Sequence, residues 1–344
     1  MPSRITKTID KKFLIVAPAF RDWDLGNYLE KLCIAKKIRC KTFAYRSFNT
    51  GQEANTRLLE IARDYRPKVM LGIKMERIYP DTIKAIKQQD VFSVLWQVDC
   101  FGEEVPQDLK LLLKEVDLFF TTAKGMVLKY AALGQTPVYW MHEGVYLPAF
   151  PLKRLAPYWR RTYTSQVAFI GNIFQPPVSD KNLALRRFKL LKSISQKYRL
   201  KIWGSQGDTL ARKKWGASDY PVIAWPAYHE EMVKICQAAK IVLGINTVNT
   251  VELYFSNRTF LTLAGGGFHL THYVPGLEEM FRNHRHLVWF KSDRECLDLI
   301  DYYLKRPRLR KRIAGNGQRL VRRRYTMRKQ FNRMLNIIDA HYAK

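Results

Sequence analysis

Two successive series of alternating strand and helix signals constrain the fold of this chain more than any other feature. In the first half, apolar runs such as residues 13–20 and 90–99 alternate with segments of helical spacing, such as residues 24–37. Apolar runs without polar alternation are typical of parallel strands buried on both faces of a sheet. The alternation resumes at residues 166–172 and continues beyond residues 228–238. The pattern predicts an α/β protein with two doubly wound, Rossmann-like domains.

The chain length agrees with two domains, because 344 residues are enough for two units of about 150 residues each. We expect an N-terminal Rossmann-like domain at residues 1–145 and a proline-containing linker at 146–165. A second Rossmann-like domain should follow at 166–315, and a basic C-terminal helix at 316–344 should cross back to the first domain. Open parallel sheets bind ligands at the carboxyl ends of their strands, so we expect a cleft between the two domains.

The charge is extreme, with 59 Lys and Arg residues against 30 Asp and Glu residues, a net charge of +29. Such an excess predicts attraction to an anionic partner, which could be nucleic acid, a membrane surface or an acidic substrate. The five cysteines are scattered and odd in number, which favours a reducing, cytoplasmic location without a disulfide framework. A peripheral position at the inner face of a membrane is compatible with the same charge. We expect no cofactor and no metal, because the histidines and strand-end carboxylates lack the spacing of metal ligands.

The segment SNRTFLTLAGGGFHLT, residues 256–271, combines a helix start, an arginine and three successive glycines. Ser256 or Asn257 can cap a helix that begins at Arg258, and Gly265 to Gly267 can end it. One interpretation is an ordinary capped helix followed by a turn. The other is a phosphate site, in which Arg258 and the helix start bind a diphosphate and the three glycines allow the backbone to approach the ligand.

This segment also belongs to an ordered set of motifs. The set includes FIGN at residues 169–172, HEEMVKICQAAKIVLGIN at 229–246 and YYLKRPRLRKRIAGNGQRLVRRRYTMRKQF at 302–331. From about residue 90 onward, the chain resembles the CgeB-like, spore-maturation-type glycosyltransferases. The resemblance implies a GT-B fold, which consists of two Rossmann-like domains with a cleft between them. It also implies metal-independent transfer of a hexose from a nucleotide sugar, for which UDP is the expected carrier.

Carried over to this sequence, the resemblance assigns several residues to the donor site. Gly171 and Asn172 would face the donor phosphates, Arg258 would contact the diphosphate, and Tyr228 would lie near the nucleobase. One position departs from the family pattern, because the glutamate expected to bind the donor ribose is Leu261 here. Leucine cannot accept a hydrogen bond from a hydroxyl group. A catalytically idle protein that binds nucleotides or nucleic acid on the same fold is therefore an alternative.

Three residues are candidates for the catalytic machinery. Asp99 ends a predicted strand, where a parallel sheet presents side chains to a ligand, and His142 and Glu143 follow the last strand of the first half. An inverting sugar transfer needs a carboxylate or a histidine as general base. The alternative for His142 is a purely structural role at the domain junction.

The C-terminal segment at residues 304–334 is strongly basic and contains no acidic residue. Its apolar residues keep a helical spacing, so it could be a packed helix with a solvated basic face. It could also be a surface that holds an anionic acceptor or a membrane. The candidates for such a surface are Arg322, Arg323, Arg324, Arg328 and Lys329. The expected acceptor is a glycan or a lipid-linked molecule, and a DNA-modifying glycosyltransferase is the alternative that the charge also suits.

Overall fold

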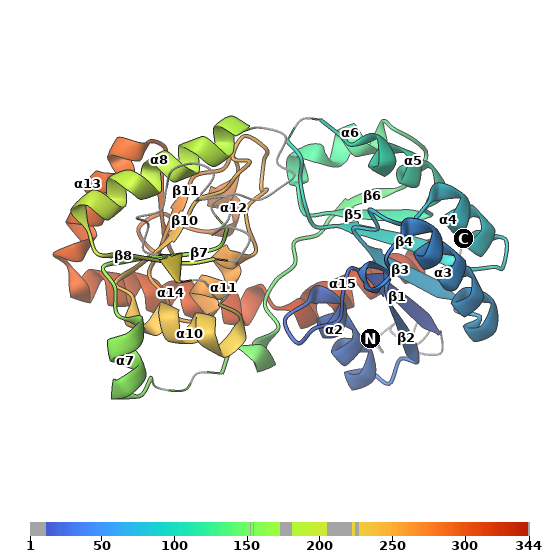
Figure 1. Ribbon diagram of the computed structural model, residues 1–344, viewed down its shortest axis with the longest axis horizontal. Coiled ribbons are helices and arrows are strands. Elements are labelled where there is room, and N and C mark those ends of the chain that lie inside the picture. The colour runs from blue at the N-terminus through green and yellow to red at the C-terminus, as the bar shows by residue number, and fades with distance from the viewer. Residues whose placement is uncertain are drawn as a thin grey trace. The chain divides into compact units, whose positions relative to one another are not determined.

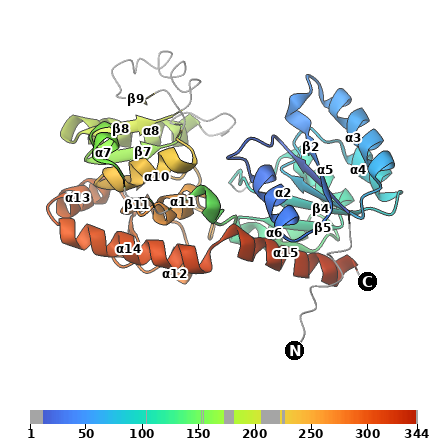
Figure 2. The same ribbon diagram turned by 90° about the horizontal axis from the view of Figure 1, so that it is seen from below.

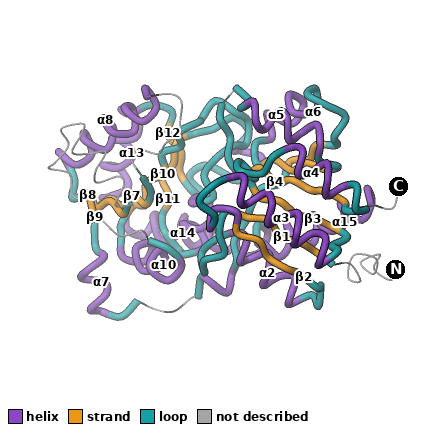
Figure 3. Tube along the Cα trace, turned by 45° about the vertical axis from the view of Figure 1, so that its right-hand side comes forward, coloured by secondary structure: helices purple, strands orange, loops and turns teal. Residues whose placement is uncertain are grey.

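The chain folds into two compact units, each built around one parallel sheet (Figure 1). The computed structural model describes residues 12–102, 104–151, 153, 155–172, 181–204, 222–223 and 227–342. Unit 1 comprises residues 1–143 and 327–344, and unit 2 comprises residues 144–326. Figure 3 shows the strands of each unit enclosed between helices. The predicted α/β class with two doubly wound, Rossmann-like sheets is confirmed.

The sheet of unit 1 has six parallel strands in the order β2-β1-β3-β4-β5-β6. Phe13 at the start of β1 pairs with Cys40 on one side and Val69 on the other, which fixes the register of the centre of the sheet. All five residues of β1 and of β3 are buried, as expected for strands covered on both faces. The strands are β1 (Phe13–Ala17), β2 (Cys40–Ala44), β3 (Val69–Ile73), β4 (Phe92–Gln97), β5 (Leu118–Thr121) and β6 (Val138–Trp140).

Helices cover both faces of this sheet. On one face, α3 (Gly51–Tyr65) packs beside α4 (Pro80–Lys87), and α4 packs beside α5 (Gln107–Glu115). Thr50 and Glu53 form a capping box that fixes the start of α3. On the other face, α2 (Leu25–Ala35) packs beside α15 (Met327–Tyr342), the last helix of the chain (Figure 2). The shorter elements are η1 (Tyr45–Ser47), η2 (Lys124–Met126) and α6 (Val127–Ala131).

The sheet of unit 2 also has six parallel strands, in the order β12-β11-β10-β7-β8-β9. From β7 the chain continues outward to β8 and β9, and it then returns to β10 on the other side of β7. The order of the strands therefore reverses between β7 and β10, and such a switch point is where doubly wound sheets bind ligands. The strands are β7 (Val167–Ile170), β8 (Leu200–Trp203), β9 (Val222–Ile223), β10 (Ile241–Gly244), β11 (His269–His272) and β12 (Val288–Phe290).

The helices of unit 2 also form two layers. On one face, α8 (Lys181–Lys197) and α13 (Asp293–Leu304) share an apolar core with the strands. On the other face, α10 (His229–Ala238) contacts α11 (Arg258–Ala264), and α11 contacts α14 (Pro307–Arg324). The shorter elements are η3 (Leu147–Ala149), α7 (Pro157–Tyr163) and α12 (Leu277–Met280).

The C-terminal segment differs from the single helix that the periodicity suggests. The structure has two helices, because α14 ends at Arg324 and α15 begins at Met327. The carbonyl of Tyr325 accepts a hydrogen bond from the amide of Val145 at 2.9 Å, and Val145 also forms a parallel bridge with Thr326. These contacts take the place of helical hydrogen bonds. The segment expected as a linker, 146–165, contains the two short helices η3 and α7.

Among the residues that the structure describes, no helix combines the length and the apolar character needed to cross a bilayer.

Candidate functional site

A small pocket lies at the switch point of the sheet in unit 2. Its floor consists of the carboxyl ends of β7 and β10, from Phe169 and Ile170 and from residues 242–246. The start of α11 closes one side through Ser256, Arg258 and Thr259. The pocket therefore has the position that open α/β sheets use for ligands.

Arg258, which lines this pocket, lies against Gly171, the residue after β7. Gly171 follows β7 with φ +142°, and a Cβ atom there would lie 3.0 Å from the guanidinium carbon of Arg258. The guanidinium thus lies directly against the backbone at the end of β7. An arginine held at a strand end is suited to a diphosphate, because its planar group donates paired hydrogen bonds to phosphate oxygens.

The start of α11 is held by polar side chains rather than by an ideal cap. The hydroxyl of Ser256 accepts a hydrogen bond from the amide of Arg258 at 3.4 Å, while Asn257, the N-cap residue, is in the helical region and makes no side-chain cap bond. The carboxamide oxygen of Asn246, just after β10, accepts from the amide of Ser256 at 3.1 Å. Since α11 has seven residues, the anion contact predicted here is expected from Arg258 and not from the helix start.

His269 is a buried neighbour of Arg258 that the sequence did not single out. Its Nδ1 lies 3.1 Å from the carbonyl of Val242, and its Nε2 lies 3.3 Å from the hydroxyl of Thr259. Burial, and secondarily the charge of Arg258, lower the pKa of His269 to about 4. Gly244 leaves room for the ring, because a Cβ atom there would lie 2.7 Å from its Cε1. His269 is therefore a neutral support for the first turn of α11.

Arg187 is a second residue that the sequence analysis missed. It lies on α8, is 3% exposed, and donates to the carbonyls of Asn172 at 2.7 Å and Ile245 at 2.9 Å. These two carbonyls follow β7 and β10, so Arg187 ties together the two strand ends that form the pocket. Asn172 thus takes part in the site through its backbone.

The three successive glycines have a different place from the predicted one. Cβ atoms at Gly265 and Gly267 would lie 3.1 and 3.2 Å from the Cβ of Cys236 on α10, and one at Gly266 would lie 2.7 Å from Nε2 of Gln318 on α14. They lie between the end of α11 and the start of β11, at the amino edge of the sheet, whereas Arg258 lies at the carboxyl edge. The packing of α11 against α10 and α14 explains these glycines, and the predicted contact with donor phosphates is replaced by contacts with protein.

Two further donor-site candidates can be placed within unit 2. Tyr228 is the N-cap residue of α10 and is 40% exposed. Part of the loop expected beside the nucleobase, residues 224–226, lies outside the described residues. Leu261 is half-buried on α11, one turn after Arg258. No carboxylate is found among the described residues that line the pocket.

In unit 1, charged residues gather at the carboxyl edge of the sheet. Asp99, after β4, forms an ion pair with Lys74, after β3, with 2.5 Å between Oδ2 and Nζ. Glu76 contacts Tyr45 and Arg46, which follow β2. Burial and the neighbouring Glu76 raise the pKa of Tyr45. Burial also acts to raise the pKa of Glu76, but the hydrogen bonds from Tyr45 and Arg46 outweigh it, so the pKa of Glu76 is lowered. The sequence pointed to Asp99 alone and missed its neighbours.

The backbone that carries Lys74 is strained. Lys74 and Met75 adopt left-handed conformations with φ of 62° and 59°. The buried Met75 side chain packs onto Gly72, where any Cβ atom would collide with its sulfur. Strain of this kind persists where the surrounding structure holds it, often at functional sites. The packing of Met75 onto Gly72 therefore holds Lys74 in its position at the charged edge of unit 1.

The other two catalytic candidates lie after β6. His142 is buried, and burial together with Arg333 lowers its pKa to about 3. Its ring lies 5.9 Å from that of Trp140, measured between centroids. His142 is thus neutral near pH 7 and packed inside unit 1, and both its catalytic role and the structural alternative stay predictions. Glu143 is half-buried at the end of the same segment.

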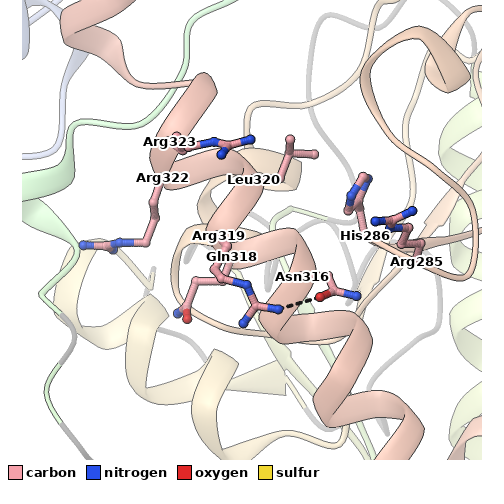
Figure 4. Close-up of a pocket in the computed structure, with 8 residues that line it drawn as sticks. All are labelled: Arg285, His286, Asn316, Gln318, Arg319, Leu320, Arg322 and Arg323. Atoms are coloured by element: carbon pink, nitrogen blue, oxygen red, sulfur yellow. Dashed lines mark hydrogen bonds between the residues drawn. The ribbon is translucent and has the colours of Figure 1, made fainter.

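The basic C-terminal candidates do not form one surface of one helix. Arg322 is half-buried and donates to the carbonyls of Phe150 at 2.9 Å and Ala264 at 3.3 Å, so it caps the end of α11. Arg323 and Arg324 are exposed on α14 in unit 2, and Arg323 is drawn in Figure 4. Arg328 and Lys329 are exposed on α15 in unit 1. The five candidates thus belong to two helices in two different units, and an anionic partner held by them stays a prediction.

Within the described residues, no three His, Cys, Asp or Glu side chains gather where they could hold a metal ion.

Comparison with known proteins gives the context for this geometry. Residues 186–336 match the family described as glycosyl transferase-like. HepE of Anabaena, solved with UDP and glucose, has a TM-score of 0.66 at 10% identity, over 96% of this chain and 100% of that chain. Sucrose-phosphate synthase of Thermosynechococcus elongatus has a TM-score of 0.68 at 12% identity, also over 96% and 100%. A glycosyltransferase of Rickettsia africae has a TM-score of 0.63 at 10% identity, over 96% and 98%. No curated protein sequence matches the chain significantly.

These likenesses extend over both units, and the family match spans Arg258 and His269, which line the pocket in unit 2, and Arg187, which ties its strand ends together. The chain therefore has the GT-B fold, and residues 186–336 of its second unit are similar to the glycosyl transferase-like family.

Proposed function

We propose that the chain transfers a hexose from a UDP-linked donor, bound at Arg258, to a glycan or a lipid-linked acceptor. The observation that carries the proposal is the guanidinium of Arg258 against the backbone of Gly171, at the switch point of unit 2. HepE of Anabaena, which has a similar fold, was solved with UDP-glucose. The order of motifs from residue 90 onward further favours the CgeB-like group of glycosyltransferases.

In such a transfer, an acceptor oxygen forms a bond to the anomeric carbon of the sugar, while the bond to the diphosphate breaks. Negative charge develops on the leaving diphosphate, and we expect Arg258 to stabilise it. The acceptor hydroxyl also loses a proton, which a carboxylate can accept. Among the predicted candidates, Asp99 fits this role better than His142, because Asp99 lies at the carboxyl edge of its sheet and His142 is buried.

The test is calorimetric titration of UDP into the wild-type protein and into Arg258→Ala. We expect UDP to bind roughly ten- to a hundredfold more weakly to the variant, since a hydrogen bond to a charged group contributes about 1.5–3 kcal/mol. Arg294→Ala, which removes an exposed arginine from α13, is the matched control and should bind UDP normally. Unchanged UDP affinity in Arg258→Ala would disprove the assignment of the diphosphate site.

Leu261 supports a second candidate, a protein that binds a nucleotide without turning it over. A leucine stands where the resembling family has its ribose-binding glutamate, and the pocket has no carboxylate among its described residues. Incubation with a panel of UDP-sugars and detection of released UDP separates the two functions. Binding of UDP without release from any donor would favour the idle protein.

The net charge of +29 keeps a DNA acceptor as an alternative to a glycan or lipid-linked one. Sugar transfer to duplex DNA, compared with transfer to lipid-linked acceptors, decides between them.

A further inference from the structure

A basic groove lies on unit 2, between α14 and the loop of residues 281–287 that precedes β12. Its hollow of about 590 Å³ is lined by Arg285 and His286 from the loop and by Arg319 and Arg323 from the helix, together with polar and apolar neighbours. Figure 4 shows the loop side chains and the helix side chains on opposite sides of this hollow. None of the eight described residues that line it is acidic.

The two walls are brought together by a glycine inside a helix. Any Cβ atom at Gly317 of α14 would collide with the carbonyl oxygen of His286 and would lie 2.7 Å from Cδ2 of Leu263. Glycine in a helix interior costs about 1 kcal/mol relative to alanine. Here it allows α14 to contact the loop directly, so that Arg285 and Arg319 face the same hollow. Because like charges repel, this arrangement is well suited to an anion placed between them.

The loop is held in shape by its own hydrogen bonds. The carbonyl of Arg282 accepts from the amides of Arg285 at 3.2 Å and His286 at 3.0 Å. The amide of Arg282 donates to Nδ1 of His286 at 3.1 Å, so Nε2 carries the proton of the neutral ring. Burial and then the charges of Arg285, Arg282 and Arg324 lower the pKa of His286. The loop therefore holds the Nε2–H group of His286 as a fixed hydrogen-bond donor beside the guanidinium groups of Arg282, Arg285 and Arg324.

We propose that this groove binds a ligand with more than one phosphate group. Guanidinium groups pair with phosphate oxygens through two hydrogen bonds at once, and several arginines on both walls match several phosphates. A volume of about 590 Å³ lies within the usual range for small-molecule sites and exceeds what a single phosphate fills. The concave shape favours a discrete phosphorylated group over the continuous backbone of duplex nucleic acid.

The groove is separate from the site at Arg258. The loop of residues 281–287 precedes β12, and Gln318 and Arg322 of α14 donate to the carbonyl of Ala264, at the end of α11. The groove is thus at the amino edge of the sheet, while Arg258 is at the carboxyl edge. A ligand in the groove is additional to the sugar donor, and this proposal does not depend on the proposed function.

The first experiment titrates inorganic tripolyphosphate into the protein by calorimetry. The test variant is Arg285→Gln/Arg319→Gln, and the matched control is Arg308→Gln/Arg312→Gln, two exposed arginines of α14 outside the groove. Both variants lose two positive charges, so a difference between them reports on position and not on net charge. Each is also made in an Arg258→Ala background, which removes the other anion candidate. We expect at least tenfold weaker binding in the test variant and less than twofold weaker binding in the control.

The second experiment identifies the source of the phosphate. The wild-type protein and each variant are pelleted with vesicles that contain cardiolipin, whose headgroup carries two phosphates, and vesicles of phosphatidylcholine measure background. A selective loss of pelleting in the test variant identifies a lipid headgroup, whereas a selective loss of tripolyphosphate binding alone identifies a soluble ligand; both support the groove.

Equal losses in the test and control variants, or no binding by the wild-type protein to either probe, would overturn the proposal. The proposal would also be overturned if the protein bound duplex DNA tightly and the test and control variants weakened that binding to the same extent. If Arg285→Gln/Arg319→Gln lowers the melting temperature, Arg323→Gln repeats the test at an exposed arginine that lines the groove, with Arg308→Gln as its matched control. The same selective loss is then required.

Discussion

Substitution of Gly317 by alanine should destabilise unit 2, although alanine is the better helix former. The methyl group would meet the carbonyl oxygen of His286 and Cδ2 of Leu263, and neither the loop backbone nor the buried leucine can turn away. Ordinary contact requires α14 and the loop to separate by about 1 Å, and overpacking of this kind costs about 1–3 kcal/mol. The gain from helix propensity is about 1 kcal/mol, so we expect a net loss of up to about 2 kcal/mol.

Gly315 on the same helix provides a matched control of opposite sign. A Cβ atom there meets only the far end of the Arg319 side chain, at 3.4 Å, so Gly315→Ala should stabilise the protein by about 0.5–1 kcal/mol. For a unit of this size, 1 kcal/mol corresponds to a change in melting temperature of about 2–4 °C. Differential scanning calorimetry of the two variants measures the difference. If Gly317→Ala were as stable as Gly315→Ala, the close approach of α14 to the loop would be refuted.

Two further predictions concern ionisable groups. The pKa values of His142 and His269 are lowered to about 3 and 4 in the folded protein, so their stabilising contribution is complete above their ordinary pKa of about 6.5 and is lost as the pH falls towards 4. The loss of stability is at most ~1.4 kcal/mol per pH unit for each histidine. The melting temperature of the wild-type protein should therefore fall from pH 7 to pH 5. The fall should be smaller in His142→Gln, and a fall as large as that of the wild-type protein would contradict this reasoning. For catalysis, Asp99→Asn should lower kcat by roughly 10²–10⁴-fold if Asp99 is the general base, and Lys74→Met by less than tenfold. Equal losses in a UDP-release assay would mean that Asp99 acts only through its ion pair with Lys74.

The fold class could be predicted because buried parallel strands leave a signal that survives in the sequence. Strands β1 and β3 are apolar throughout, and polar residues at their ends mark where they stop. The place of Arg258 at the start of a helix could also be predicted, because a polar capping residue before an apolar run is a recognisable local pattern. The division of the C-terminal segment into α14 and α15 could not, since its apolar period continues on both sides of Tyr325 and the break depends on the distant Val145.

The glycines and the buried charges show a different limit. A run such as Gly265 to Gly267 looks the same whether its neighbour is a phosphate or a helix, and only the fold reveals Cys236 and Gln318 beside it. Arg187 did leave a signal, because it lies three, four and seven residues before Leu190, Leu191 and Ile194, on the apolar face of its helix. A charged residue in that position is buried only when it has partners, so it pointed to a structural role near the site.

The assignment of α15 to unit 1 has a consequence for the time course of synthesis. Residues 12–142 provide the whole sheet of unit 1, but α15, which packs beside α2, follows only after about 180 residues of unit 2. At ~5–20 residues per second, roughly ten to forty seconds separate the two events on the ribosome. During that interval the apolar surface that later receives Met327, Phe331, Met334, Leu335 and Ile338 has no cover from its own chain. Until α15 is synthesised, a chaperone that binds apolar surfaces can therefore act on the uncovered surface of unit 1 in the nascent chain.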